Sequence, residues 1–455
     1  MHKSLVALLV LLFPSSTFLL GQMNRASLPD APQHVLVLTP PSETGAVPET
    51  LTREQAEQLA IKNNPRVSVA ALLALAQKQV TRETRAGELP SLFGNGAGVG
   101  AEEASRLSSD GLTASRLLNH VGAGVQVSQL ITDFGHTRNL VSSSSLQAKA
   151  AEQSAEATRE DIVFAVDVAF YNALEAQATL RVAASTAQER QNVASQIDAL
   201  TNSKLKSTLD QSFAHVTLSQ ARLLMLDSQN QENAAMAALS DILGTTSDVH
   251  YTLVDDVTMP PPPANSAQAL IALALQQRPD LRAQQLVHQA DVRFSRAQHE
   301  QLLPTISARG TAGVTPVRST TYFLQDWYGA AGINLSVPIF DGFKFRAEAA
   351  EADLRAKASD EKSRQLTDRI VRDVRTAWLN MLTAKERMSV TAELLKEANT
   401  SLDLAQTRYQ LGLSSIVELS QAQLEQTQAQ IQDANARFEY ESDLATLRFQ
   451  SGTRP

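Results

Sequence analysis

Three stretches of the chain carry residue types that could do chemistry, and none has the partners that its chemistry requires. Gly96–Ala101 reads GAGVGA and fits the GxGxxA fingerprint of a dinucleotide site, but it precedes a polar loop instead of opening a helix. Asp133–Gly135 spells a protein-kinase motif without the glycine-rich loop or the His-Arg-Asp of a kinase. His288 and His299 lie roughly three turns apart on one expected helix, too far for a shared metal. We therefore expect no enzyme activity, no cofactor and no metal site.

Composition excludes further classes of site. The 455 residues contain no cysteine, which rules out disulfides, thiolate metal sites, cysteine nucleophiles and a lipid-modified N-terminal cysteine. The net charge of −8 and the pI near 5.6 do not support nucleic-acid binding, which favours a basic patch. Aromatic residues make up only 5% of the chain, as is typical of long helices packed through small side chains.

Two stretches predict strands that lead into long helices. Gly332–Arg346 reads GINLSVPIFDGFKFR, and Gly124–Arg138 reads GVQVSQLITDFGHTR. Apolar residues alternate with small or polar ones in both, which is typical of a strand between an apolar environment and water, such as a barrel strand. Each strand then passes through an expected strand-to-helix turn, and the turn residues are Asp133 and Gly135 in the first copy and Asp341 and Gly342 in the second.

These stretches belong to an internal duplication that covers most of the chain. Asn64-Pro65 matches Arg278-Pro279, and Leu89-Pro90 matches Leu303-Pro304 at the same offset of 214 residues. Beyond the strands the offset is 208 residues, as the pairs Asp133 with Asp341 and Gly244 with Gly452 demonstrate. The two halves therefore align from end to end, and the first half has extra residues in a loop between its strands.

The duplication predicts two pairs of strands. Leu92–Gly100 would pair with His120–Ile131, and Thr305–Val314 with Tyr328–Phe340. Strands of about ten residues are long enough to cross a bilayer at a tilt. Four strands cannot close a barrel, and four open strands in lipid would leave unpaired edges. We therefore expect oligomerisation, with about twelve strands from three chains.

Helices account for the rest. Thr52 and Gln55 form an expected capping box, and the first helices run to Pro65 and from there to about Gly87. Neither Thr137–Thr201 nor Phe343–Gln410 contains Gly or Pro, and each could extend over roughly 100 Å. Apolar residues recur at spacings of three and four and predict helix-on-helix packing: Ile162, Val166, Phe170, Ala173, Leu174 and Ala178, then Ile370, Val374, Ala377, Trp378, Met381 and Leu382.

The expected organisation has five parts. Residues 1–26 read as an export signal, for which an N-terminal membrane anchor is the alternative. An extended segment (27–50) follows, then the first repeat (51–254), a proline-rich linker (255–265) and the second repeat (266–452). Each long helix turns and returns, through 202–207 in the first half and Leu411–Ser415 in the second.

In this ordered arrangement the chain resembles the TolC-like outer-membrane factor family, the exit ducts of Gram-negative efflux and secretion systems. The resemblance rests on the duplicated segments LTREQAEQLAIKNNP and SAQALIALALQQRPDL, the two Leu-Pro pairs, LITDFGHTR with VPIFDGFKFR, and the turn segment RYQLGLSSIVEL. It covers nearly all of residues 50–452.

The resemblance implies an α+β membrane protein. It implies a homotrimer whose twelve strands form a barrel among outer-membrane lipids and whose coiled-coil-like helices form a periplasmic α-barrel. The trimer would be a passive exit duct of a tripartite efflux or type I secretion system. It would dock on a periplasmic adaptor and an inner-membrane transporter of the RND, ABC or MFS type. Leu411, Gly412, Leu413 and Ser414 would form an adaptor-contacting tip.

Asp210 and Glu418 lie just past the turns between the long helices and the returning helices, and two roles are compatible with this position. A ring of Asp210 and Glu418 in an oligomer would narrow the periplasmic entrance and favour cations. Acidic residues near a helix N-terminus are also favourable without any pore. The first-half turn lacks the Gly-Leu-Ser of the second, so the motif supports only the second as an adaptor contact.

Two other functions compete with the duct. A periplasmic coiled-coil adaptor or scaffold would account for the helices but not for the strands between them. A secreted enzyme would need a convergent set of acid, base or nucleophile residues, which the sequence lacks. No GxxxxGK[ST] motif occurs, so export would draw its energy from partners. The exported substrate stays open among drugs, metal ions, proteins and polysaccharide-linked cargo.

Overall fold

The computed structural model describes residues 49–99, 106–107, 115–116, 120–245, 251–255, 266–314 and 327–453. Several expected segments lie outside these residues: the export signal (1–26), residues 27–48 of the extended segment, most of the polar loop after the first strand, and residues 256–265 of the linker.

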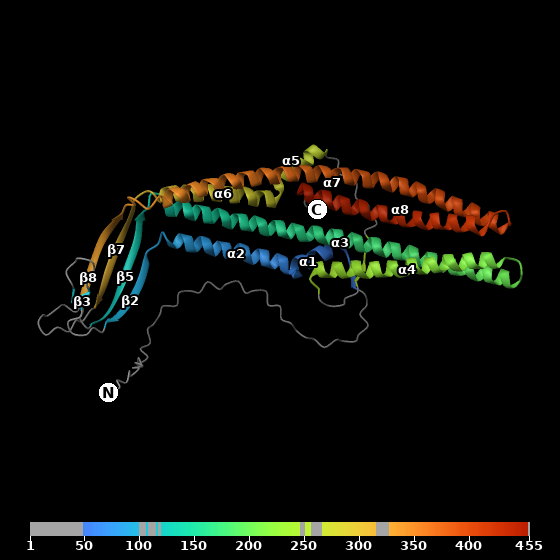
Figure 1. Ribbon diagram of the computed structural model, residues 1–455, viewed down its shortest axis with the longest axis horizontal. Coiled ribbons are helices and arrows are strands. Elements are labelled where there is room, and N and C mark those ends of the chain that lie inside the picture. Colours follow the sequence, from blue (N-terminus) through green and yellow to red (C-terminus); the bar gives the residue numbers. More distant parts are fainter. Residues whose placement is uncertain are drawn as a thin grey trace, which may run out of the picture. The chain divides into compact units, whose positions relative to one another are not determined.

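The two halves contain the same succession of long elements (Figure 1). The first half consists of β1 (Glu49–Leu51), α1 (Arg53–Asn63), α2 (Pro65–Ala86), β2 (Ser91–Val99), β3 (Arg106–Leu107), β4 (Ser115–Arg116), β5 (His120–Thr132), α3 (His136–Asn202), α4 (Thr208–Leu243) and β6 (Tyr251–Leu253). The second consists of α5 (Ala267–Gln277), α6 (Pro279–Glu300), β7 (Thr305–Val314), β8 (Trp327–Ser336), α7 (Lys344–Gln410) and α8 (Ile416–Ser451). The helices match in length between halves, with 11, 22, 67 and 36 residues in order.

Local signals set the helix ends where the sequence predicts them. The Thr52 hydroxyl accepts a hydrogen bond from the Gln55 amide, and the Gln55 side chain accepts one from the Thr52 amide. This capping box satisfies two amides that the first turn leaves open. The Asn64 side chain caps α2 by accepting a hydrogen bond from the Arg66 amide at 2.9 Å. Pro65 occupies the first turn, where the missing amide hydrogen costs nothing. The predicted capping box and helix boundary are therefore confirmed.

Four strands form one antiparallel sheet in the order β2-β5-β7-β8. The predicted pairs β2 with β5 and β7 with β8 are confirmed. The central pairing, in which β5 of the first half joins β7 of the second, is not among the predicted pairs. This pairing makes one sheet from both halves.

The prediction of the last strand was wrong at both ends, because β8 runs from Trp327 to Ser336 and not from Tyr328 to Phe340. Its pairing with β7 ends at Thr305 opposite Ser336, where β7 begins directly after Pro304. Pro338 has no amide hydrogen to extend the ladder. The apolar alternation past Ser336 therefore continues without a paired strand.

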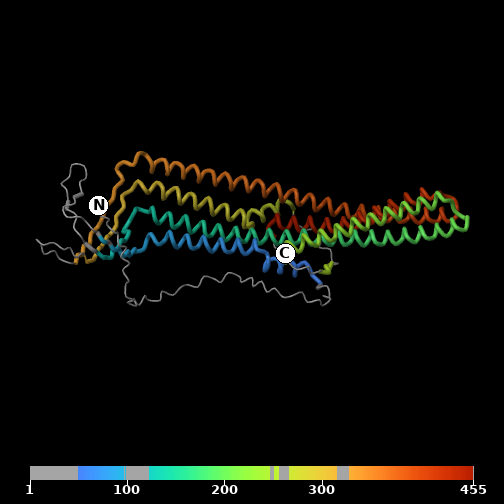
Figure 2. Tube along the Cα trace, turned by 60° about the horizontal axis from the view of Figure 1, so that its bottom comes forward, coloured from blue at the N-terminus to red at the C-terminus, as the bar shows by residue number. Residues whose placement is uncertain are grey.

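The helices follow the order of the strands. Helix α2 packs on α3, α3 on α6, and α6 on α7, and each of these helices is joined directly to β2, β5, β7 or β8, respectively (Figures 1 and 2). Helix α4 returns along α3 and α8 returns along α7, and α3 also packs against α8. The long helices thus form the predicted coiled-coil-like hairpins.

Three apolar clusters stabilise this arrangement. The predicted α3 stripe from Ile162 to Ala178 lies in a cluster with α1, the end of α4 and the parallel pair β1–β6. The predicted α7 stripe lies in a second cluster with α5 and α8, where Trp378 and Leu382 are partly buried. A third cluster joins the helix ends around Ile197, Leu218 and Tyr409. None of the helices in the described ranges combines the length and apolar character that a membrane-spanning helix needs.

Candidate functional site

The four-stranded sheet has two chemically different faces. Register places Val127 opposite both Leu92 and Gly310, and Ile333 opposite Ala308, so one face is apolar. Its large side chains are exposed, with Ile333 at 75%. An extensive exposed apolar surface on a sheet requires a covering that is not water.

Polar side chains occupy the opposite face. Gln126 lies opposite Thr311, Ser128 opposite Arg309, and Ser307 opposite Asn334. Phe93, opposite Gln126, and Leu130, opposite Ser307, are large apolar exceptions on this face. Gln129, opposite Ala308, is a polar exception on the apolar face. The alternation that the sequence indicated is therefore present across the whole sheet and not in single strands alone.

Tyr328 crosses the polar face over two glycines. A Cβ added at Gly124 would lie 2.6 Å from the Tyr328 hydroxyl oxygen, and one added at Gly313 would lie 2.7 Å from it. Because real Cβ atoms do not approach other atoms so closely, the tyrosine can lie flat over the sheet only where both positions are glycine.

The outer edges of β2 and β8 pair with no other described strand of this chain. Both strands are nine to ten residues long. Long edges with free backbone groups are templates for pairing with a further strand. Both outer edges of the sheet are therefore open to pairing with a further strand.

The strand-to-helix turns occupy the same positions in the two halves. Asp133 accepts hydrogen bonds from the Gly135 amide at 3.2 Å and the Thr137 amide at 2.7 Å, and Asp341 accepts one from the Phe345 amide at 2.7 Å. Burial alone would raise the pKa of Asp133, but the hydrogen bonds from Thr137 and Gly135 outweigh it and lower that pKa. Each aspartate holds the open amides at the start of a long helix.

Two consecutive residues in each turn have positive φ. They are Phe134 (56°) and Gly135 (118°) in the first half, and Gly342 (70°) and Phe343 (68°) in the second. Phenylalanine and glycine thus exchange places while the backbone conformation is kept. A left-handed phenylalanine is strained, so the surrounding hydrogen bonds must hold it there.

The predicted tip lies between α7 and α8. Leu411 and Leu413 are each 68% exposed, and Gly412 has a φ of 73° that favours glycine. The Ser414 hydroxyl is buried and has no hydrogen-bond partner. In the first half Lys204, at the position equivalent to Gly412, takes a φ of 60°. The two tips therefore share one backbone shape although only one contains glycine.

Both predicted entrance carboxylates have local partners. Asp210 accepts from the Ser207 amide at 3.2 Å and from its hydroxyl at 2.9 Å, which completes the capping box of α4. Glu418 forms an ion pair with Arg408 at 3.1 Å, with its side chain 45% exposed. Each carboxylate thus contributes to its own helix end in the single chain, and no contact between the two carboxylates is present among the described residues.

Tyr409 and Lys206 connect the two tips, and neither residue was predicted from the sequence. The Lys206 ammonium lies 3.8 Å from the centre of the Tyr409 ring. The Tyr409 hydroxyl is buried without a partner, and burial raises the pKa of its phenol, with a further contribution from the Asp210 charge.

Arg190 links the same hairpins further along. Its guanidinium is buried, donates to the Gln423 carbonyl at 3.0 Å and has its pKa lowered by burial. Replacing it would leave that carbonyl without its partner.

A buried charged group fixes α1 to α3. Arg53 contacts the carboxylate oxygens of Glu57 at 2.6 Å and Asp167 at 3.4 Å. Burial, followed by the charge of Asp167, raises the pKa of Glu57 to about 7, although Arg53 opposes the change. Burial also raises the pKa of Asp167. In the described part of the chain, no group of three or more His, Cys, Asp or Glu side chains could hold a metal ion.

Comparisons with known proteins agree on one family. The family model described as "Outer membrane efflux protein" matches residues 57–245 and 270–453. Outer membrane protein TolC of Escherichia coli is 23% identical over 88% of this chain and 82% of its own length. The solvent efflux pump outer membrane protein SrpC of Pseudomonas putida is 26% identical over 80% of this chain and 77% of its own length.

Solved structures have the same fold. The outer-membrane channel OprN superposes with a TM-score of 0.78 at 19% identity over 88% of this chain and 89% of its own. The CmeC outer membrane channel of Campylobacter jejuni superposes with a TM-score of 0.77 at 16% identity over 88% and 85%.

Proposed function

The chain belongs to the outer membrane efflux protein family, and from that premise we propose that it is the passive exit duct of a tripartite efflux or type I secretion system. Three copies would pair their β2 and β8 edges into a twelve-stranded barrel in the outer membrane. The helices joined to those strands would line a passage through the periplasm. The matching family model describes outer membrane efflux proteins, and this supports the expectation that the chain has no enzyme activity.

One observation supports this proposal most directly. The sheet has an apolar and a polar face, both of its edges are open, and each of its strands directly follows or precedes a helix of 22 or 67 residues. Four strands cannot enclose a lumen, whereas twelve lie within the range of outer-membrane barrels. The apolar face would meet lipid, and Gln126, Ser128, Arg309 and Asn334 would line the water-filled interior.

We further propose that the two halves arose by duplication and that the chain divides into the two repeats 51–254 and 266–452. The matched helix lengths and the exchange of Phe and Gly in the two strand-to-helix turns support a common origin. The fold makes one sheet from both repeats, so neither repeat would be stable alone.

The helical tips would contact a periplasmic adaptor, which in turn binds an inner-membrane transporter. Leu411 and Leu413 are large, apolar and exposed at the turn, as a docking surface requires. A photoreactive side chain at Leu413 should crosslink to an adaptor in cells, and one at the equally apolar Leu404 on the side of α7 should not. Equal crosslinking from both positions would contradict a docking role of the tip.

Asp210 and Glu418 would narrow and charge the entrance. Single-channel conductance of the purified trimer in planar bilayers tests the duct and the entrance together. We expect discrete, cation-selective steps that lose selectivity in the pair Asp210→Asn and Glu418→Gln. The control pair Asp227→Asn and Glu425→Gln removes the same charge farther along α4 and α8.

Three outcomes are distinguishable. Loss of selectivity in the tip pair alone supports both the duct and the charged entrance. If neither pair of substitutions changes the selectivity, the protein is still a duct, but Asp210 and Glu418 do not form its charged entrance. A folded trimer that never produces conductance steps rejects the duct.

A further inference from the structure

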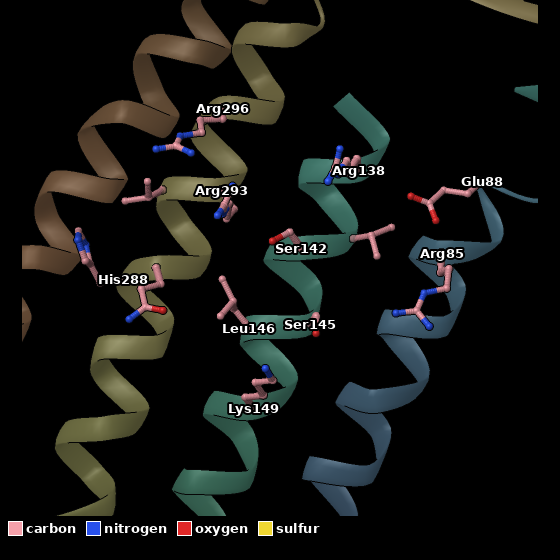
Figure 3. A pocket seen from close by; sticks show the side chains of 13 residues that line it. Arg85, Glu88, Arg138, Ser142, Ser145, Leu146, Lys149, His288, Arg293 and Arg296 are labelled. Carbon is pink, nitrogen blue, oxygen red and sulfur yellow. The ribbon is translucent and has the colours of Figure 1, made fainter. Parts of the chain in front are cut away.

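A basic groove lies between α2, α3 and α6 at their strand-proximal ends (Figure 3). Its volume is about 590 Å³. Cationic side chains enter it from all three helices, with Arg85 from α2, Arg138 and Lys149 from α3, and Arg293 and Arg296 from α6. Glu88 is the carboxylate in the lining.

No carboxylate in the described part of the chain pairs with any of the five cations. Among the described residues, none of them forms an ion pair within 4.0 Å, Glu88 included, and all five are exposed. Elsewhere on the same helices Lys78 and Arg159 do form ion pairs with nearby carboxylates. Like charges gathered in one groove repel each other unless an anion occupies it. The groove therefore has the composition of an anion site.

The groove opens on the side of α3 that carries α1. Arg138, Ser142, Ser145 and Lys149 follow one another at helical spacing, and the same face of α3 continues to Asp167, which contacts Arg53 of α1. A passage lined by three chains could not conduct if it also held three copies of α1 and β1–β6. Given the proposed duct, on which this step rests, the groove faces outward into the periplasm.

The groove begins close to the sheet. Arg85 is six residues before β2, Arg138 is six residues after β5, and Arg296 is nine residues before β7. At about 1.5 Å per residue these side chains lie roughly 9–14 Å from the strands. Because the headgroup layer is roughly 5–8 Å thick on each side of a bilayer, Arg85 and Arg138 lie at its periplasmic edge and reach headgroups through the length of their side chains. Lys149 follows β5 by 17 residues and lies farther from the membrane. Because α2 and α7 are joined to the edge strands β2 and β8, neighbouring chains would contact each other through these two helices. Helix α3 lies between them, so the neighbouring chains would not cover the groove on it.

We propose that this groove binds the phosphate headgroup of an anionic glycerophospholipid from the periplasmic leaflet of the outer membrane. Arginine forks from two helices match phosphate oxygens in a bidentate geometry. The hydroxyls of Ser142 and Ser145 lie in the same lining and can donate to the remaining oxygens. Each trimer would hold three such lipids and fix its depth in the membrane through them.

Native mass spectrometry of the full-length trimer in detergent, titrated with phosphatidylglycerol, tests the proposal. The test variant combines Arg138→Gln with Arg296→Gln. The control combines Arg181→Gln with Arg369→Gln, which removes two exposed arginines outside the groove. Size-exclusion chromatography shows first that both variants remain trimeric.

We expect up to three tightly bound phosphatidylglycerol molecules per trimer and weaker binding of phosphatidylcholine, which has no net charge. The test variant should bind phosphatidylglycerol about 25-fold more weakly, at roughly fivefold for each cation removed, and higher salt should weaken binding further. The control variant should bind it like the unchanged protein.

Equal phosphatidylglycerol binding by the test and control variants would overturn the proposal. A second result would also overturn it: the test variant loses binding of inorganic phosphate but binds phosphatidylglycerol as the unchanged protein does. The groove would then be a site for a free anion and not for a lipid headgroup. Single-channel conductance of the same preparations separates the two proposals. Conductance without specific lipid binding rejects only the lipid site, and absence of conductance rejects the duct.

Discussion

Gly313 tolerates no side chain, because three parts of the sheet meet at its Cα. A Cβ added there would lie 2.6 Å from the Ala123 carbonyl oxygen, 2.7 Å from the Tyr328 hydroxyl and 2.8 Å from the Gly124 Cα. Two of these three neighbours are backbone atoms and cannot rotate away. The variant Gly313→Ala should therefore force β5 and β7 apart at the one pairing that joins the two halves.

The expected loss of stability is about 1–3 kcal/mol per chain, the usual range for overpacking a rigid site. Gly310 provides the matched control, since it lies on the same strand and the nearest atom to its Cβ would be 3.9 Å away. We expect Gly310→Ala to be nearly neutral. The assay is the midpoint temperature of trimer dissociation for purified protein at one fixed concentration.

Gly124→Ala distinguishes a clash with the Tyr328 side chain from a clash with the backbone of the neighbouring strand. Its closest neighbour would be the Tyr328 hydroxyl at 2.6 Å, followed by the Ala312 carbonyl oxygen at 3.0 Å. Truncation by Tyr328→Ala should therefore relieve much of the defect of Gly124→Ala and little of the defect of Gly313→Ala. Such a double-mutant cycle isolates the contact. The reasoning fails if Gly310→Ala and Gly313→Ala lower the midpoint equally, or if Tyr328→Ala rescues both glycine variants alike.

Three further perturbations follow from single sites. Because the pKa of Glu57 is raised from 4.5 to about 7, its contribution to stability is fully present below pH 4.5 and is lost as the pH rises through about 7. The thermal unfolding midpoint of Glu57→Gln should therefore equal that of the unchanged protein at pH 5 and lie above it at pH 8. The same difference in midpoint at both pH values would contradict the raised pKa. Phe170→Ala should cost about 3–5 kcal/mol, because the ring is buried in the cluster around α1 and α3, and denaturant unfolding measures the loss. Gly412→Ala should cost about 1 kcal/mol of stability, because alanine is disfavoured at the left-handed φ of this position. Lys204→Gly at the equivalent position should be neutral or stabilising. If both variants change the unfolding midpoint in the same direction, backbone conformation is not the cause of the effect.

Sequence alone determined the elements of this chain. Thr52 with Gln55, Asn64 with Pro65, and the glycines at 244, 412 and 452 locate helix ends through interactions within a few residues. The apolar stripes on α3 and α7 predicted their packing faces, because a helix repeats its surface every 3.6 residues. The one strand that was misplaced, β8, continues in pattern beyond the point where its partner ends.

Only the tertiary structure decided how the two halves meet. The joining of β5 to β7, the Lys206 contact with Tyr409, the group of Arg53, Glu57 and Asp167, and the basic groove all bring together residues far apart in the chain. No period or spacing in the sequence marks such groups, because each group draws residues from more than one helix, strand or turn. Their juxtaposition depends on the packing of whole elements, and local signals in the sequence end within a turn or two of where they act.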